Sequence, residues 1–191
     1  RRTASVRSST SDADQPGDQA FRGRMDDVTA YLDTAVVLRI LGRASPELVQ
    51  AAEEFVQLCR GTNCRLAVFP HNVEEIRRIH QGAAAAIRGH RAVENQLARW
   101  AFENYMSAAD VIELAAALED DIRAAGIEIV EAPPLTEELS VDERGLRLQL
   151  QIDLKQSEEG TRDTDVKSLT AIFRAREGRG FKYVEKCRAI F

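Results

Sequence analysis

An aspartate that separates two apolar runs is the feature that most constrains the fold of this chain. A short apolar run occupies 28–32, Asp33 follows it, and a second apolar run occupies 34–41. We expect a buried strand, then the acid, then a helix. In open α/β sheets the carboxyl ends of the strands form the edge where ligands bind, and a buried carboxylate is usually paired or bound to a metal. Asp33 is therefore either a helix cap or the first ligand of a metal site.

Short apolar runs alternate with longer helical patterns along the rest of the chain. We expect strands at 28–32, 65–69, 126–130 and 187–191. We expect helices at 34–41, 46–60, 72–89, 92–125 with a break near 107, 141–155 and 166–176. The segment 141–155 suits a strand because its leucines alternate, and a helix because they recur four residues apart; a helix is slightly favoured. Alternating strands and helices predict an α/β protein with a mostly parallel sheet.

Single residues indicate helix ends and buried faces. Ser45 followed by Pro46 marks the start of the second helix. Asn72 is the expected cap of the third helix, with Glu75 completing an approximate capping box, and Gly89 is expected to end it. The buried side of the helices over 92–125 is expected to carry Trp100, Phe102, Tyr105, Val111, Leu114 and Leu118.

Composition restricts the class of protein. The 191 residues are 44% hydrophobic and 30% charged, which is typical of a soluble globular domain. Residues 1–24 are rich in Ser, Thr, Asp, Gly and Arg and are expected to form a disordered tail. We find no apolar run that suits a membrane span or a secretory signal. The first methionine is Met25, so we expect the chain to be a piece of a longer protein.

The net charge limits the kinds of partner that the protein can bind, and the cysteine content indicates its cellular compartment. The formal net charge of −5 excludes a generic basic coat for nucleic acid, while a local basic patch is still compatible with it. The three cysteines show no paired C-x-x-C motif, so a reducing, cytoplasmic setting is expected. The three histidines form no H-E-x-x-H zinc motif, and His71 is a candidate for a phosphate contact.

Acidic residues follow a common logic with respect to the expected strands. Asp33 ends the first strand, Glu75 is expected in the first turn of the helix after the second strand, and Asp163 and Asp165 are expected at the start of the helix before the last strand. Parallel topology brings such positions to one edge. Each acid alone is more simply a helix cap. Together they predict a carboxylate cluster, whose mutual repulsion a cation would relieve; its hard oxygen ligands suit Mg²⁺ or Mn²⁺, which can promote phosphodiester cleavage.

A basic segment follows the last of these acids. It contains Arg174, Arg176, Arg179 and Lys182, with the aromatic residues Phe181 and Tyr183 between and after them. Such residues can hold an RNA backbone and stack on bases. The alternative is that they are ordinary charges at the end of a helix and on a solvated face.

Four blocks, taken in order, resemble the PIN-like domain family. Residues 31–39, Tyr-Leu-Asp-Thr-Ala-Val-Val-Leu-Arg, resemble the family's opening strand that ends in Asp-Thr-Asn. Residues 68–76 resemble its second block, 162–172 its third, and 187–191 the strand before its fourth motif. The similarity covers about 28–82 and 160–191. It implies a bacterial type of three-layer PIN-like fold over 25–191, with a central mostly parallel sheet, a helical insertion at about 90–158, and a chain truncated after the fourth-block strand.

This resemblance also implies a function. PIN domains are typically metal-dependent ribonucleases, which implies Asp33, Glu75 and Asp165 as catalytic ligands of Mg²⁺ or Mn²⁺, with Asp163 as the alternative third ligand. Arg174, Arg176, Arg179 and Lys182 would contact the phosphates of single-stranded RNA. We also expect that the chain can associate with a second copy or with a protein regulator, and that it does not bind membranes.

One departure from the family keeps other functions open. Ala35 stands where the family has Asn after Asp-Thr. The first alternative is therefore a catalytically weakened PIN-like module that binds RNA or a protein partner. A second alternative is a regulatory or scaffold domain that uses its helical insertion for oligomer contacts, which exposed apolar residues on the 93–125 helices would support.

Overall fold

A small parallel sheet organises the molecule. The computed structural model describes residues 24–89, 96–153 and 159–191. Its sheet, within these ranges, consists of β1 (Thr29–Tyr31), β2 (Arg65–Val68), β3 (Glu128–Ile129) and β4 (Ala189–Ile190), in the order β3-β2-β1-β4. Every strand pair is parallel. The predicted α/β class with a mostly parallel sheet is thereby confirmed, and each strand lies inside its expected range.

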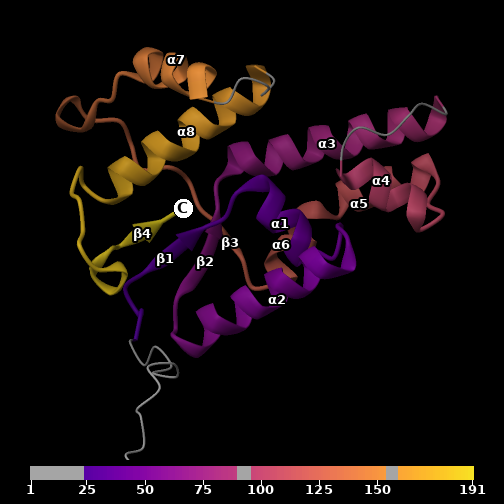
Figure 1. Cartoon of the computed structure of the whole chain (residues 1–191), viewed down its shortest axis with the longest axis horizontal. Helices are drawn as coiled ribbons and strands as arrows, with labels where there is room; N and C mark the ends of the chain where they lie inside the picture. The colour runs from indigo at the N-terminus through magenta and orange to yellow at the C-terminus, as the bar shows by residue number, and fades with distance from the viewer. Residues whose placement is uncertain (1–23, 90–95, 154–158) are drawn as a thin grey trace, which may run out of the picture.

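The order of the strands determines where a site can form. β1 lies between β2 and β4, with Tyr31 opposite Ala67 and Thr29 opposite Ala189. The chain therefore moves from β1 to β2 and β3 on one side and returns to place β4 on the other side (Figure 1). In parallel sheets such a reversal of direction leaves a crevice at the carboxyl ends of the strands. Asp33 follows β1 at this point.

Helices make up most of the described chain. Their bounds are α1 (Thr34–Ile40), α2 (Pro46–Gly61), α3 (Pro70–Arg88), α4 (Gln96–Glu103), α5 (Ala108–Ala116), α6 (Leu118–Ala124), α7 (Glu143–Asp153) and α8 (Glu159–Ala175), with short 3₁₀ turns at Glu137–Leu139 and Val184–Lys186. The ambiguous segment 141–155 contains the helix α7, as slightly favoured, and α7 packs against α8. None of the described helices combines the length and apolar character that a membrane span requires.

Alternation along β1 divides the interior between the two faces of the sheet. Ala30 and Leu32 join a large core that includes Val56 of α2. Tyr31, pointing the opposite way because successive strand residues alternate, packs instead with a small core formed by Phe69, Ala171, Ile172 and Ala189. Figure 1 accordingly shows α2 and α8 on opposite sides of the sheet. The molecule thus has helix, sheet and helix layers around β1.

The start of α3 differs from its expected position, whereas its end and the start of α2 do not. Gly89 caps the C-terminus of α3 as predicted, but α3 begins at Pro70 with Phe69 as its N-cap, so Asn72 is not the cap. Proline suits the first helical turn because its φ angle is preset and its missing N–H is not needed there. Glu75 therefore lies in the second turn. Ser45 does cap α2 by position, although its side chain makes no capping hydrogen bond.

The described part of the segment 92–125, which begins at residue 96, contains two breaks where one is expected. Ser107 caps α5 with a complete capping box, and Ala117 separates α5 from α6. The expectation that Phe102 and Tyr105 are buried is wrong, since they are 70% and 96% exposed. The reason is local: α4 ends in a reversal in which Tyr105 has a φ angle of 53°. Of the same set, Val111 and Leu118 are buried as expected.

The structure describes only parts of the predicted tail, 1–24, and of the predicted helical insertion, 90–158. Residues 1–23 of the predicted tail lie outside the described residues, and Arg24 pairs with Asp26 at 3.0 Å. The segment 90–158, expected as a helical insertion, also contributes β3, which pairs with β2 through Ala67 and Glu128. This segment is thus part of the sheet as well as of the helical layers.

Candidate functional site

Three predicted acids from distant segments influence one another electrostatically. Asp33 is the N-cap of α1, where its Oδ1 accepts a 2.7 Å hydrogen bond from the Thr34 amide. Glu75 lies on α3, and Asp165 lies on α8, which packs against α3. The charges of Asp33 and Asp165 raise the pKa of Glu75, and Asp33 raises that of Asp165. These three acids therefore lie within electrostatic range of one another, although Asp165 lies in the second turn of α8 rather than at its start.

Burial is the largest cause of the altered titration of these acids. Burial raises the pKa of Glu75, a hydrogen bond from Thr34 lowers it, and the two neighbouring carboxylates raise it again. Burial also raises the pKa of Asp165, ahead of the effect of Asp33. Both acids are therefore costly to ionise in this environment. A bound cation would reduce that cost by compensating the negative charge.

The chemistry of these donors can be compared with the needs of a metal ion. Carboxylate oxygens suit Mg²⁺ and Mn²⁺. Among the residues that the structure describes, no group of three or more His, Cys, Asp or Glu side chains could hold a metal ion. Mg²⁺ commonly takes only one or two carboxylates directly and keeps several waters. One or two of these carboxylates could therefore serve as direct ligands of a hydrated ion of this class.

Asp163 is not part of this group. Its Oδ1 lies 3.0 Å from a guanidinium nitrogen of Arg147, which belongs to α7. Residues two apart on a helix are rotated by about 200°, so Asp163 and Asp165 face different neighbours. The structure therefore places the predicted alternative ligand in an ion pair between α7 and α8.

A chain of buried hydrogen bonds connects the elements that carry the acids. The Thr34 hydroxyl donates to Oε2 of Glu75 at 2.6 Å, and Nδ2 of Asn72 donates to the Thr34 oxygen at 3.4 Å. The Ser168 hydroxyl donates to Oδ1 of Asn72 at 3.3 Å. Sequence reasoning missed these three polar residues as site components. The available signal was that each lies next to an acid or one helical turn from it.

His71 extends this chain at its far end. Its Nε2 lies 2.9 Å from the Ser168 oxygen, and because that hydroxyl donates to Asn72, we assign Nε2 as a donor. Burial, followed by the charge of Lys167, lowers the pKa of His71 to about 4. The ring also stacks on Phe69, which stacks on Tyr31. His71 is therefore neutral near pH 7 and held in place; the predicted phosphate contact is not tested by this arrangement.

The four predicted phosphate contacts have different surroundings. Nε of Arg176 donates to the Ala189 carbonyl at 2.6 Å, so this side chain ties α8 to β4. Arg179 pairs with Glu177 at 3.3 Å, and Nζ of Lys182 lies 5.4 Å from the Tyr183 ring. Arg174 is half-buried. Arg179 and Lys182 are the exposed members of this set.

Two other cations act through their charges on residues of this region. Arg78 lowers the pKa of Glu75 through its charge, and Lys167 has the corresponding effect on the pKa of His71. Both side chains are exposed. They come from α3 and α8, the same two helices that carry Glu75 and Asp165. Positive charge from α3 is therefore near Glu75, and positive charge from α8 is near His71.

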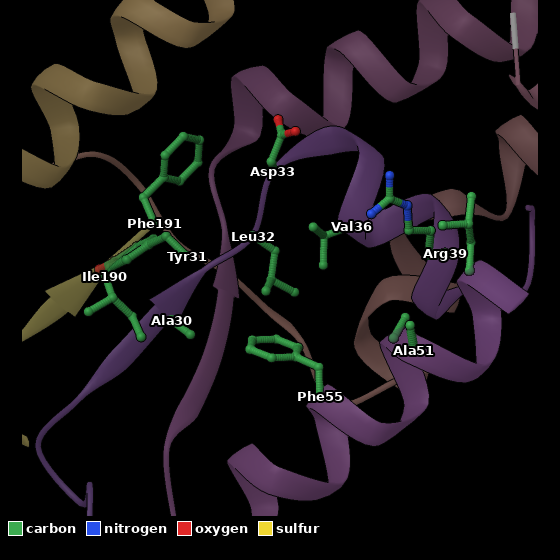
Figure 2. A pocket seen from close by; sticks show the side chains of 12 residues that line it. Ala30, Tyr31, Leu32, Asp33, Val36, Arg39, Ala51, Phe55, Ile190 and Phe191 are labelled. Atoms are coloured by element: carbon green, nitrogen blue, oxygen red, sulfur yellow. The ribbon is translucent and has the colours of Figure 1, made fainter. Parts of the chain in front are cut away.

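An apolar cavity of about 370 Å³ lies below the acidic edge. Figure 2 shows it between β1, β4, α1 and α2, with Leu32, Val36 and Phe55 directed toward it. Asp33 borders the cavity, but its carboxylate points away from these apolar side chains in the same view. The cavity and the carboxylate group are therefore separate features that share one boundary residue.

Comparisons of the chain with models of known protein families, with curated proteins and with solved structures find no match. The function must be argued from the residues of the site. Two of its properties bear on that function: the electrostatic coupling of carboxylates from three segments, and the position of Asp33 directly after β1 at the carboxyl edge of the parallel sheet.

Proposed function

We propose that this protein is a metal-dependent ribonuclease with a PIN-like fold, in which Asp33, Glu75 and Asp165 hold Mg²⁺ or Mn²⁺. The observation that carries the proposal is the electrostatic coupling of these three carboxylates, which arrive from α1, α3 and α8. Their order along the chain matches the order of the motifs that resemble the family. Their location beside the carboxyl end of β1 is where open α/β sheets bind ligands.

The residues of the site have distinct roles in this proposal. A divalent ion bound there supplies acidification of water and neutralisation of phosphate charge. The Thr34 hydroxyl holds Oε2 of Glu75 and leaves Oε1 available as a ligand. The backbone amide of Thr34 holds Oδ1 of Asp33 in the same way. One oxygen of Glu75 and one of Asp33 are thus held by Thr34, and the other oxygen of each is proposed as the ligand.

Nucleic acid is the substrate class that the surrounding charges favour. The chain as a whole carries a net charge of −5, so attraction of a polyanion requires local cations. Arg78 acts through its charge on Glu75, Lys167 acts on His71, and Arg179 and Lys182 are exposed beyond the end of α8. We propose that these four hold the phosphates of single-stranded RNA, with Tyr183 available for base stacking. A cytoplasmic setting follows from this substrate.

Cleavage of single-stranded RNA in the presence of Mn²⁺ tests the proposal. The wild-type protein should cleave with Mn²⁺ and stop when EDTA is added. Asp33→Asn should lose roughly 100-fold or more of that activity, because it removes a charged group from the reacting centre. Asp163→Asn separates the two candidate third ligands and should cleave far better than Asp165→Asn. Equal turnover by the wild type and Asp33→Asn would remove the metal-site proposal.

Specific observations favour one second candidate, a catalytically weakened PIN-like module that binds RNA or a protein partner. Ala35 follows Thr34 where the family has Asn, and the described residues include no closed three-ligand group. Phe102, Tyr105 and Ile112 also expose apolar surface on and beside α4 and α5. Tight RNA binding without cleavage in Mn²⁺ would favour this candidate, and a folded protein that neither binds nor cleaves RNA would favour a protein partner.

A further inference from the structure

Each of the three acids has a buried polar neighbour on its own element. Thr34 directly follows Asp33, Asn72 lies one turn before Glu75, and Ser168 lies one turn after Asp165. Thr34 is 7% exposed, and Asn72 and Ser168 are fully buried at 0%. A buried polar side chain therefore lies within one helical turn of each acid along the chain. Burial of three such groups is costly unless they bond to one another.

These three neighbours do bond to one another, in a single consistent donor order. Ser168 donates to Asn72, Asn72 donates to Thr34, and Thr34 donates to Glu75. The residues come from α8, α3 and α1, up to 134 positions apart in the chain (168 minus 34). A shift of any one helix would leave at least one buried polar group without its partner. The network therefore fixes the three elements relative to one another.

The position of this network explains how mutually repelling acids are kept near one another. Asp33, Glu75 and Asp165 come from three helices, and charged carboxylates repel one another, which tends to separate the helices that carry them. The Thr34, Asn72 and Ser168 bonds oppose this force from the interior side. Hydrogen bonds behind metal ligands orient the ligands and commonly alter metal affinity by about 10–100-fold.

We propose that Thr34, Asn72 and Ser168 form a positioning network that holds the acids of α1, α3 and α8 at the spacing that a divalent ion needs. The inference rests on the proposed metal site and extends it to residues that do not touch the ion. It assigns Ser168, on α8, to the alignment of Glu75 through Asn72 and Thr34. The hydroxyl groups of Thr34 and Ser168 and the amide group of Asn72, rather than the size of these side chains, carry this role.

Direct binding of Mn²⁺ tests the network without relying on catalysis. The free Mn²⁺ signal in electron paramagnetic resonance gives a dissociation constant for the whole chain. Ser168→Ala and Thr34→Val each remove one hydroxyl and should weaken Mn²⁺ binding by about 10-fold or more. Thr34→Ser keeps the hydroxyl and should restore near-wild-type affinity. This rescue separates positioning from packing, because Thr34→Val preserves the shape that Thr34→Ser does not.

Thr170→Val is the matched control on α8. Thr170 is 3% exposed, and its hydroxyl donates to the Lys167 carbonyl of the same helix, outside the network. Its loss should leave Mn²⁺ affinity within about threefold of wild type, well below the change expected for the network variants. Circular dichroism checks that each variant is folded, and Thr34→Val decides the outcome if Ser168→Ala does not fold.

The outcomes separate this inference from the function on which it rests. Wild-type binding of Mn²⁺ with unchanged affinity in Ser168→Ala and Thr34→Val would overturn the positioning network and leave the metal site standing. Weak binding in Thr34→Ser as well as in Thr34→Val would also overturn it, because packing would then explain the loss. Failure of the wild type to bind Mn²⁺ would overturn the metal site and the network together.

Discussion

Asp163 and Asp165 stand two residues apart on α8 and serve different neighbours. Asp163 pairs with Arg147 of α7 at 3.0 Å, whereas Asp165 has its pKa raised by burial and by the charge of Asp33. Positions two residues apart on a helix are rotated by about 200°. Asp163 therefore takes part in a stabilising ion pair, whereas the ionised form of Asp165 destabilises the fold. The same substitution at the two positions should therefore have opposite effects on stability.

We predict that Asp165→Asn stabilises the metal-free protein increasingly as the pH rises. Because the folded protein raises the pKa of Asp165 above its ordinary 3.8, the favourable contribution is complete below 3.8 and is lost as the pH passes the raised value. Asparagine cannot ionise and avoids this loss. Thermal unfolding in EDTA should show an advantage that grows to about 2–4 °C, the effect of about 1 kcal/mol in a chain of this size.

Asp163→Asn is the matched control for that measurement. It removes the ion pair with Arg147, which is partly exposed on both sides, so the expected loss is at most about 1 kcal/mol. Its difference from wild type should not turn into an advantage at higher pH. If the difference in unfolding temperature between Asp165→Asn and wild type did not change with pH, Asp165 would not have a raised pKa in the folded protein.

His71 should make the protein sensitive to moderate acid. The fold lowers the pKa of His71 from 6.5 to about 4, so the stability that it contributes is present above 6.5 and is lost as the pH falls toward 4. His71→Gln keeps an Nε2 donor for Ser168 but does not titrate. Between about pH 7 and pH 5, wild type should lose on the order of 1–2 kcal/mol relative to His71→Gln in urea unfolding. Parallel curves for the two proteins would contradict this role.

Arg43 is held in the interior by two partners. It is 3% exposed, its Nη1 donates to Nε2 of His80 at 2.9 Å, and its Nη2 is paired with Asp121. Asp121→Ala removes the charged partner of this buried guanidinium. Since Asp121 itself is partly exposed, we predict a cost of about 2 kcal/mol, between the values for surface and buried pairs. Unfolding in urea measures this cost.

Asp120→Ala is the neighbouring control for that prediction. Asp120 pairs with Arg123 at 3.3 Å, and both side chains are largely exposed. Its removal should cost less than about 0.5 kcal/mol. Similar losses for Asp120→Ala and Asp121→Ala would show that the Arg43 pair has no special weight in the fold.

Tyr105 offers a stabilising substitution. It follows the end of α4 with a φ angle of 53°, its amide bonds to the Phe102 carbonyl, and the Met106 amide bonds to the Ala101 carbonyl. This pattern favours glycine at the position of Tyr105. Because the Tyr105 side chain is 96% exposed, Tyr105→Gly should gain about 0.5–1 kcal/mol by relieving the left-handed backbone. Tyr105→Ala keeps the strain and should not show this gain in thermal unfolding.

Local sequence predicted the fold most successfully where neighbours within a few residues decide the structure. The strand before Asp33 and the helix after it follow from an apolar run and a capping acid, and both lie where expected. The predicted start of α3 at residue 72 is two residues late, because Pro70 is the first residue of the helix rather than the end of the preceding strand. Glu75 moved to the second turn for the same reason, yet it still lies within electrostatic range of Asp33.

Ambiguity in the pattern was resolved by packing. The leucines of the segment that contains α7 suit both the period of a strand and the period of a helix. The segment is helical in the structure, and α7 packs against α8. Phe102 shows the opposite case, because its helical spacing suggested burial and the short α4 leaves it in solvent. Spacing indicates which residues share a face, and only the neighbouring elements decide whether that face is covered.

By itself, the sequence determined the types of the elements, the parallel α/β class, and the delivery of Asp33 to the end of a strand. These properties depend on repeats of two or 3.6 residues, which short stretches of chain contain in full. The tertiary structure alone decided that β4 lies beside β1, that Asp165 rather than Asp163 faces Asp33, that Arg176 is bound to Ala189, and that Ser168 reaches Asn72. Contacts of this second kind join residues remote in the chain, and their distances depend on how whole helices pack rather than on any local pattern.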